Sequence, residues 1–163
     1  MFPDELVMSA RLLLGDCEER KLRIVTAESC TGGLVAALLT EIPGSSKVVE
    51  RGFVTYSNRA KEEMLGVPGD LIADMGAVSE PVARAMAEGA LRESRAHISV
   101  AITGVAGPDG GTAMKPVGLV HVAAARENRS ILHEACRFGN IGRREVRLAS
   151  VEKALGLMRR LVE

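Results

Sequence analysis

The sequence is poor in aromatic residues and has no excess of charge of either sign. Only 2% of its 163 residues are aromatic, with no tryptophan and a single tyrosine, Tyr56. The core must therefore be built from aliphatic side chains and methionine. Lys plus Arg and Asp plus Glu number 21 each, so the formal net charge is zero. A duplex-binding domain normally carries a basic excess or a clustered basic face, and we therefore expect no nucleic acid partner.

Targeting and metal-binding signals are also lacking. No apolar stretch approaches the roughly 20 residues that a membrane span needs, and no basic segment at the N-terminus leads into a long apolar run, as in a secretory signal. The three cysteines form no CxxC pair, and no His, Cys, Asp or Glu cluster has the spacing of metal ligands. We therefore expect a soluble cytoplasmic protein that has no membrane partner and needs no metal or other cofactor.

The pattern of apolar residues predicts strands that alternate with helices. The composition, 47% hydrophobic and 26% charged, suits one globular domain over residues 1–163. We expect helices over 5–20, 31–40, 58–66, 79–95 and 143–162, and strands over 22–27, 47–56, 97–103, 117–125 and 131–138. The alternation indicates an α/β class, a single-domain layered sandwich whose helices flank the sheet. The sheet should be mostly parallel but mixed, because the last two strands resemble a hairpin.

Three of the predicted strands run directly into polar or glycine-rich segments. The first leads into TAESCTGG (26–33), the second into TYSNRAK (55–61) and the third into TGVAGPDGGT (103–112). Ligands of open α/β sheets gather at the carboxyl ends of the strands. We therefore expect the three segments to meet at one edge of the sheet.

The first of these segments contains two possible nucleophiles. The first amides of a helix lack partners and lie at the positive end of its dipole, so a helix that starts after Ser29 could bind a phosphate or an oxyanion. Gly32 and Gly33 would then let a ligand approach the backbone. An N-capping residue followed by packing glycines explains the spacing equally well. Cys30 either competes as a nucleophile of lowered pKa or is a small buried packing residue.

The second segment offers a base for such a nucleophile. Lys61 could activate a serine only when neutral, which requires burial or a neighbouring cation. Tyr56 could relay or donate a proton, and Asn58 could orient a substrate amide. A solvated helix lysine is the alternative interpretation of Lys61.

The remaining candidates suit an anionic ligand. The glycine-rich segment 103–112 could wrap a ligand with its backbone, or it could be a plain connection. Arg143 and Arg147, four residues apart, would share one face of the last helix, and paired guanidinium groups suit a phosphate monoester. Surface ion pairs with Glu145 or Glu152 are the alternative.

Several long motifs resemble the C-terminal domain of the competence-damage-inducible CinA family. They occur in order from about residue 5 to the end: TAESCTGG, PGSSKVVERGFVTYSN, GAVSEPVA, AITGVAGPDGGT, KPVG and a terminal pair of arginines. That domain also occurs alone as a nicotinamide-nucleotide amidase. The resemblance implies hydrolysis of nicotinamide mononucleotide (NMN) to nicotinic acid mononucleotide and ammonia, which recycles pyridine nucleotides for NAD synthesis. It also implies a small-molecule nucleotide as substrate and a homodimer.

The resemblance assigns roles to individual positions. Ser29 would be the nucleophile, Lys61 its base and Tyr56 a proton-transfer partner. The implied substrate-binding residues are Cys30, Thr31, Gly32, Gly33, Ser45, Asn58, Thr103, Gly104, Ala106, Gly107, Arg143 and Arg147. The family commonly has Gly-Asp where this sequence has Ile141-Gly142, which weakens the assignment of Arg143 to the phosphate. A nucleotide-binding regulatory module with little or no turnover is the alternative function.

Overall fold

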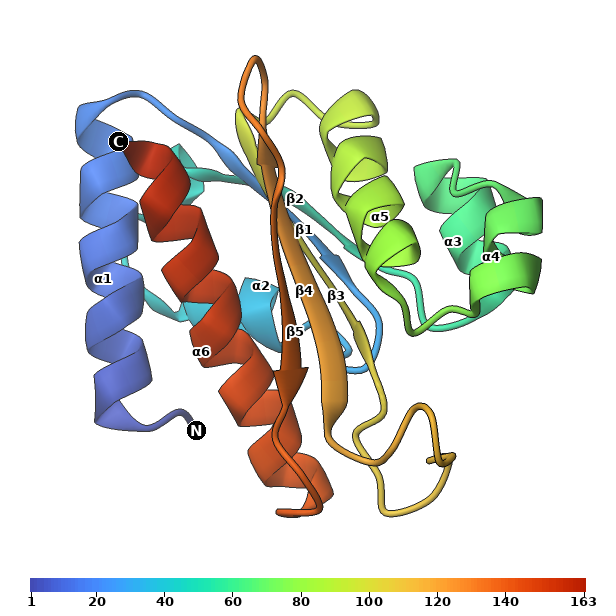
Figure 1. Ribbon diagram of the computed structural model, residues 1–163. Coiled ribbons are helices and arrows are strands. Elements are labelled where there is room, and N and C mark those ends of the chain that lie inside the picture. Colours follow the sequence, from blue (N-terminus) through green and yellow to red (C-terminus); the bar gives the residue numbers. More distant parts are fainter.

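Five strands form one sheet in the computed structural model, which describes residues 1–163 (Figure 1). The strands, in the spatial order β2-β1-β3-β4-β5, are β1 (Ile24–Glu28), β2 (Val49–Val54), β3 (Ile98–Gly104), β4 (Leu119–Arg126) and β5 (Leu132–Arg137). β1 pairs in parallel with β2 and β3, whereas β4 pairs antiparallel with β3 and β5. β4 is thus the one reversed strand, and the prediction of a mixed, mostly parallel sheet is confirmed.

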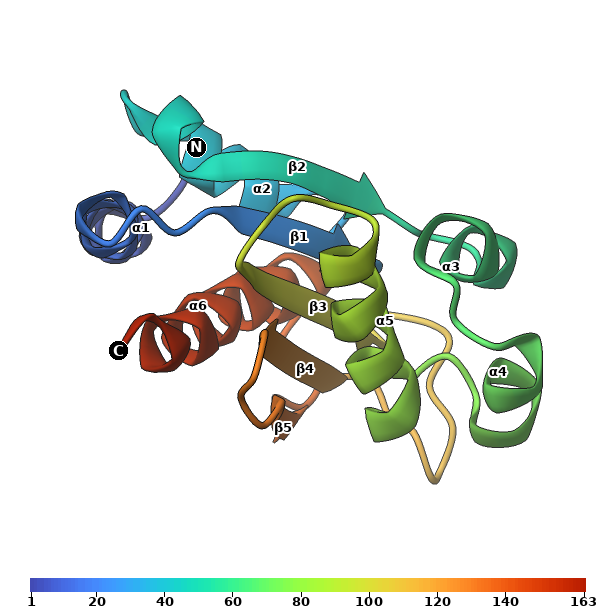
Figure 2. The same cartoon turned by 90° about the horizontal axis from the view of Figure 1, so that it is seen from above.

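Six α-helices cover the two faces of this sheet (Figure 2). One face is covered by α1 (Asp4–Glu19), α2 (Leu34–Glu41) and α6 (Arg143–Val162), and the other by α5 (Glu80–Arg92), against which α3 (Asn58–Leu65) and α4 (Gly69–Met75) pack. Each face has its own apolar cluster, with Leu13 and Leu155 fully buried on the first and Met86 on the second. Aliphatic side chains and methionine make up most of both clusters, and Phe2 and three cysteines complete the first, in agreement with the scarcity of aromatic residues. None of the helices is long and apolar enough to cross a membrane.

The elements agree with the sequence prediction except in two regions. The helix expected from residue 31 begins at Leu34, because Gly32 and Gly33 have φ angles of 60° and 109°, outside the helical region. The sequence analysis does not predict α4, whose seven residues bury only Ile72 and are too few to show helical periodicity.

The ends of β1, β2 and β3 lie at the same edge of the sheet. The register pairs Glu28, the last residue of β1, with Val54 of β2 and Ile102 of β3. Two backbone hydrogen bonds extend this alignment: Ser29 N donates to Ile102 O at 3.0 Å, and Thr55 N donates to Glu28 O at 2.8 Å. The three polar segments therefore emerge together, as expected for strands that run in the same direction.

Candidate active site

A cleft of about 330 Å³ opens where the three strand ends meet. Most of the predicted site residues line it, namely Ser29, Cys30, Tyr56, Asn58, Lys61, Thr103, Gly104, Ala106, Gly107 and Arg143. Val105, Asp109 and Gly110 of the predicted glycine-rich segment also line the cleft, as do Ala77 and Val78, which the sequence does not predict. Ala77 and Val78 lie in the connection between α4 and α5, directly before the serine that caps α5. The predicted cap at Ser79 is the only signal that could have indicated them.

Ser29 and Lys61 form a buried pair in this cleft. Lys61 Nζ lies 3.0 Å from Ser29 Oγ and 2.9 Å from the carbonyl oxygen of Thr55. The Ser57 hydroxyl caps α3 by accepting a hydrogen bond from Ala60 N at 3.0 Å, and Lys61 follows at once in the first turn. Only 1% of Lys61 is exposed to solvent, so the structure excludes a solvated lysine at this position.

Burial lowers the pKa of Lys61 below the ordinary lysine value of 10.5, and the opposing effect of Cys30 is smaller. No carboxylate forms an ion pair with this ammonium group to hold its charge. The neutral amine is therefore favoured relative to an exposed lysine. In that form Nζ, which lies 3.0 Å from Ser29 Oγ, is within the distance at which a general base can accept a hydroxyl proton.

The lowered pKa of Lys61 should make the free energy of unfolding depend on pH. At a pH between the lowered pKa and 10.5, Lys61 is protonated in the unfolded chain but neutral in the folded protein. The free energy of unfolding of the wild type therefore rises with pH over this range. We expect the unfolding free energy of Lys61→Met, relative to wild type, to be greatest at low pH and to fall as the pH approaches 10.5. Urea unfolding between pH 6 and 10 measures this difference.

Lys47, a lysine whose pKa is raised rather than lowered, provides the control for that measurement. The hydrogen bond and charge of Glu18 raise the pKa of the exposed Lys47, so Lys47→Met should not show the same trend with pH. A Lys61→Met difference that does not vary with pH would contradict a lowered pKa for Lys61.

Cys30 has the properties of a packing residue. Burial raises the pKa of its thiol to about 11, although Arg147 and Lys61 act in the opposite direction. The side chain is 6% exposed and belongs to the apolar cluster of the first face. A thiol of this pKa is protonated near neutral pH and is a poor nucleophile, which favours Ser29.

The start of α2 does not provide the anion site that the sequence predicts. The buried Glu28 carboxylate accepts hydrogen bonds from Val35 N at 2.9 Å, from Ala36 N at 3.1 Å and from the Thr31 hydroxyl at 2.7 Å. A helix start occupied by a carboxylate cannot also bind an oxyanion. The amides of Cys30 and Thr31, which precede the helix, donate to no other group of the chain.

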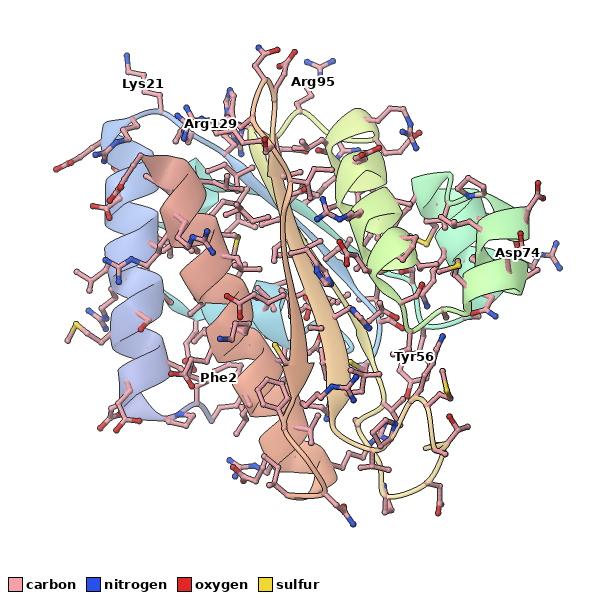
Figure 3. All side chains as sticks on the ribbon, in the orientation of Figure 1. Phe2, Lys21, Tyr56, Asp74, Arg95 and Arg129 are labelled. Atoms are coloured by element: carbon pink, nitrogen blue, oxygen red, sulfur yellow. The ribbon has the colours of Figure 1, made fainter.

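Tyr56 and Arg143 form one wall of the cleft. Arg143, the first residue of α6, donates hydrogen bonds to the Tyr56 hydroxyl at 3.0 Å and to Gly107 O at 2.7 Å. Figure 3 shows Tyr56 beside the loop that follows β3. The Tyr56 hydroxyl makes no hydrogen bond with Ser29 or Lys61. Arg143 has no carboxylate partner, and Gly142 adds no carboxylate at the helix start, so its charge is available at the cleft.

Several predicted substrate-binding residues lie outside the cleft. Arg147 binds backbone carbonyls rather than facing the cleft, and neither Gly32 nor Gly33 lines it. The positive φ angles of these glycines explain their presence without a ligand. Thr31 is fully buried against Glu28. The structure therefore does not bring these four residues to the lining of the cleft, and their direct contact with a substrate stays a prediction.

Ser45 also lies away from the cleft. It begins a 3₁₀ turn, Ser45–Lys47, that precedes β2, whereas the cleft lies beyond the other end of that strand. The six residues of β2 span roughly 20 Å at about 3.3 Å per residue. Ser45 therefore does not line the cleft of its own chain, and its contact with a substrate stays a prediction.

The candidate site contains no evident metal centre. No three His, Cys, Asp or Glu side chains of the chain are grouped so that they could hold a metal ion. The cleft itself offers a serine hydroxyl, a buried lysine amine, backbone amides and an arginine. The side chains of Tyr56, Asn58, Thr103 and Asp109 also line it.

Comparisons with known proteins identify relatives of the whole chain. The family model described as the CinA C-terminal domain matches residues 8–162. A CinA-like protein of Gemmatimonas aurantiaca is 49% identical over 151 residues, 93% of this chain and 35% of the relative. A CinA-like protein of Syntrophus aciditrophicus is 50% identical over 143 residues, 87% of this chain and 34% of the relative. The chain thus spans about a third of the length of these relatives.

Solved structures resemble the chain over its full length. The competence/damage-inducible protein CihA from Agrobacterium tumefaciens has a TM-score of 0.99 and 52% sequence identity, and the match covers 100% of this chain and 99% of that one. A CinA superfamily protein from Escherichia coli has a TM-score of 0.91 and 32% identity, and the match covers 99% of this chain and 94% of that one. Both structures have the same fold as this chain.

Proposed function

The chain belongs to the CinA C-terminal domain family, and from this premise we propose that it is an amidase that hydrolyses NMN to nicotinic acid mononucleotide and ammonia. The observation that carries the proposal is the buried Lys61 amine 3.0 Å from the Ser29 hydroxyl. A buried serine and lysine in contact form a nucleophile and base suited to acyl transfer. The resemblance of the motifs to the family supplies the substrate.

In the proposed acylation step, Ser29 Oγ attacks the carbon of the carboxamide while its proton moves to the neutral Nζ of Lys61. The carbonyl oxygen becomes an oxyanion, for which the amides of Cys30 and Thr31, unpaired within the chain, are the proposed donors. Collapse of the tetrahedral intermediate breaks the bond between carbon and nitrogen. Lys61 returns its proton to the departing nitrogen, and ammonia leaves an ester on Ser29.

In the proposed deacylation step, water attacks the ester carbon and gives a proton to Nζ of Lys61. The bond between the carbon and Ser29 Oγ breaks, and Lys61 returns the proton to Oγ. The products are the free acid and the regenerated hydroxyl. The same lysine therefore serves as base and acid in both half-reactions.

Arg143 is the proposed phosphate ligand, because it lies at the wall of the cleft and has no carboxylate partner. We expect Arg143→Met to raise KM for NMN roughly ten- to a hundredfold, the effect of losing one or two hydrogen bonds to a charged group. Nicotinamide riboside lacks the phosphate, so its kinetics should change much less. Equal changes for the two substrates would contradict a phosphate contact.

The experiment that tests the function measures ammonia and nicotinic acid mononucleotide together, with calorimetry of NMN binding alongside. Stoichiometric formation of both products supports the amidase. Tight binding without product would instead indicate the nucleotide-binding regulatory module. The observation that motivates this alternative is Gly142 at the start of α6, where the family commonly has aspartate.

A further inference from the structure

Arg147 contacts the peptide segment that follows Ser29 and is not among the residues that line the cleft. Its Nε donates to Cys30 O at 3.1 Å and its Nη2 donates to Thr31 O at 3.2 Å. The side chain is half-buried, does not line the cleft and has no carboxylate partner. The hydrogen bonds of Arg147 thus go to two successive carbonyl groups of the backbone.

The planarity of the peptide bond converts these two contacts into a constraint on the amides. In a trans peptide the carbonyl and the N–H point in opposite directions. Binding Cys30 O on the Arg147 side therefore directs the N–H of Thr31 to the opposite side. In the same way, binding Thr31 O fixes the peptide that carries the N–H of Gly32.

The constraint extends one peptide further back. Gly32 N donates to Ser29 O at 2.9 Å, so the orientation of the Gly32 peptide holds the carbonyl of Ser29. That carbonyl shares its peptide with the N–H of Cys30, which must again point the opposite way. Arg147 therefore fixes the Thr31 amide directly. It fixes the Cys30 amide through Gly32, together with Leu34 N, which also donates to Thr31 O at 3.0 Å.

The Glu28 carboxylate occupies the neighbouring hydrogen-bond donors. It accepts the Thr31 hydroxyl and the amides of Val35 and Ala36, which are the donors that would otherwise compete for an anion. The amides of Cys30 and Thr31 are left without any partner in the chain, next to the nucleophile. Unpaired donors beside a nucleophile are the components of an oxyanion hole.

We infer that Arg147 is a positioning residue that orients the Cys30 and Thr31 amides as the oxyanion hole of Ser29, rather than a ligand of the substrate phosphate. The inference rests on the proposed acyl transfer at Ser29. It separates two arginines that sequence spacing had grouped together: Arg143 faces the substrate, whereas Arg147 acts through the backbone.

The test compares Arg147→Met and Arg147→Lys with wild type, using NMN and nicotinamide riboside as substrates. Because loss of one oxyanion donor lowers kcat by about 10²- to 10³-fold, Arg147→Met should lower kcat by this order while KM changes little. The ratio of kcat/KM for the two substrates should stay the same. Arg147→Lys retains the charge and part of the carbonyl binding, so it should recover part of kcat.

Arg144→Met is the matched control, because Arg144 is the adjacent arginine of α6 and pairs only with the neighbouring Glu145 at the surface. It should leave kcat and KM unchanged. A higher KM for NMN with unchanged kcat in Arg147→Met, together with loss of preference for NMN over the riboside, would assign Arg147 to the phosphate and overturn the inference.

Hydrogen exchange of the segment over 29–36 separates failure of this inference from failure of the proposed function. If wild type released no ammonia, the proposed function would fail, but the positioning claim would still predict faster exchange of this segment in Arg147→Met than in wild type or Arg144→Met. Unchanged exchange would overturn the claim whatever the activity.

Discussion

Replacing Ser29 by alanine is expected to lower kcat for NMN hydrolysis by about 10⁴- to 10⁶-fold, the range found when a catalytic serine is removed. The variant retains the backbone but has no oxygen that can attack the carboxamide. Its fold should persist, because Ser29 N, not its side chain, forms the hydrogen bond that joins β1 to β3. Ammonia release, together with thermal unfolding, measures both expectations.

Two further variants make the Ser29 result specific. Ser46→Ala changes an exposed serine in the turn before β2 and should leave the activity at the wild-type level. Cys30→Ala tests the neighbouring thiol. Activity that persists in Ser29→Ala but disappears in Cys30→Ala would transfer the nucleophile to Cys30, in disagreement with the raised pKa of that thiol.

Replacing Lys61 by methionine is expected to lower kcat by about 10²- to 10⁴-fold, the contribution of a general base. Methionine fills a similar volume but cannot accept the Ser29 proton. Lys61→Arg should not restore activity, since a guanidinium group stays protonated in proteins. Lys47→Met, a change of an exposed lysine 66% accessible in its side chain, should keep full activity.

The pH dependence of the wild type follows from the same group. Burial lowers the pKa of Lys61, and only the amine is a base, so kcat/KM should rise with pH to a plateau with a midpoint below 10.5. This rise should be absent from the residual activity of Lys61→Met. An identical rise in Lys61→Met would show that another group titrates.

The sequence alone predicts the parts of the site that depend on strand ends. The order of strands and helices and the turns that follow β1, β2 and β3 bring Ser29 and Lys61 to one edge, because parallel strands end together. The 3.0 Å contact and the burial of Lys61 are not readable from the sequence. They depend on how α3 packs against α5, which local patterns do not encode.

The sequence interpretation differs from the structure in where individual side chains point, not in which residues gather near the site. Spacing correctly places Arg143 and Arg147 on one helix, but one turn of α6 is enough to direct Arg143 to the cleft and Arg147 to the backbone. Likewise, a glycine pair before a helix suggests an open anion site. The competing cap is Glu28, a strand residue whose side-chain direction the motif does not reveal.

The central claim, that Ser29 forms an acyl-enzyme, is tested most directly by partition of the intermediate between water and hydroxylamine. The protein is given NMN or the corresponding methyl ester, and the ratio of hydroxamate to acid is measured at one hydroxylamine concentration. Both substrates form the same ester on Ser29 once the leaving group has departed, so the account predicts the same product ratio from each. Ratios that differ between the two substrates would contradict a common covalent intermediate and, with it, the proposed role of Ser29.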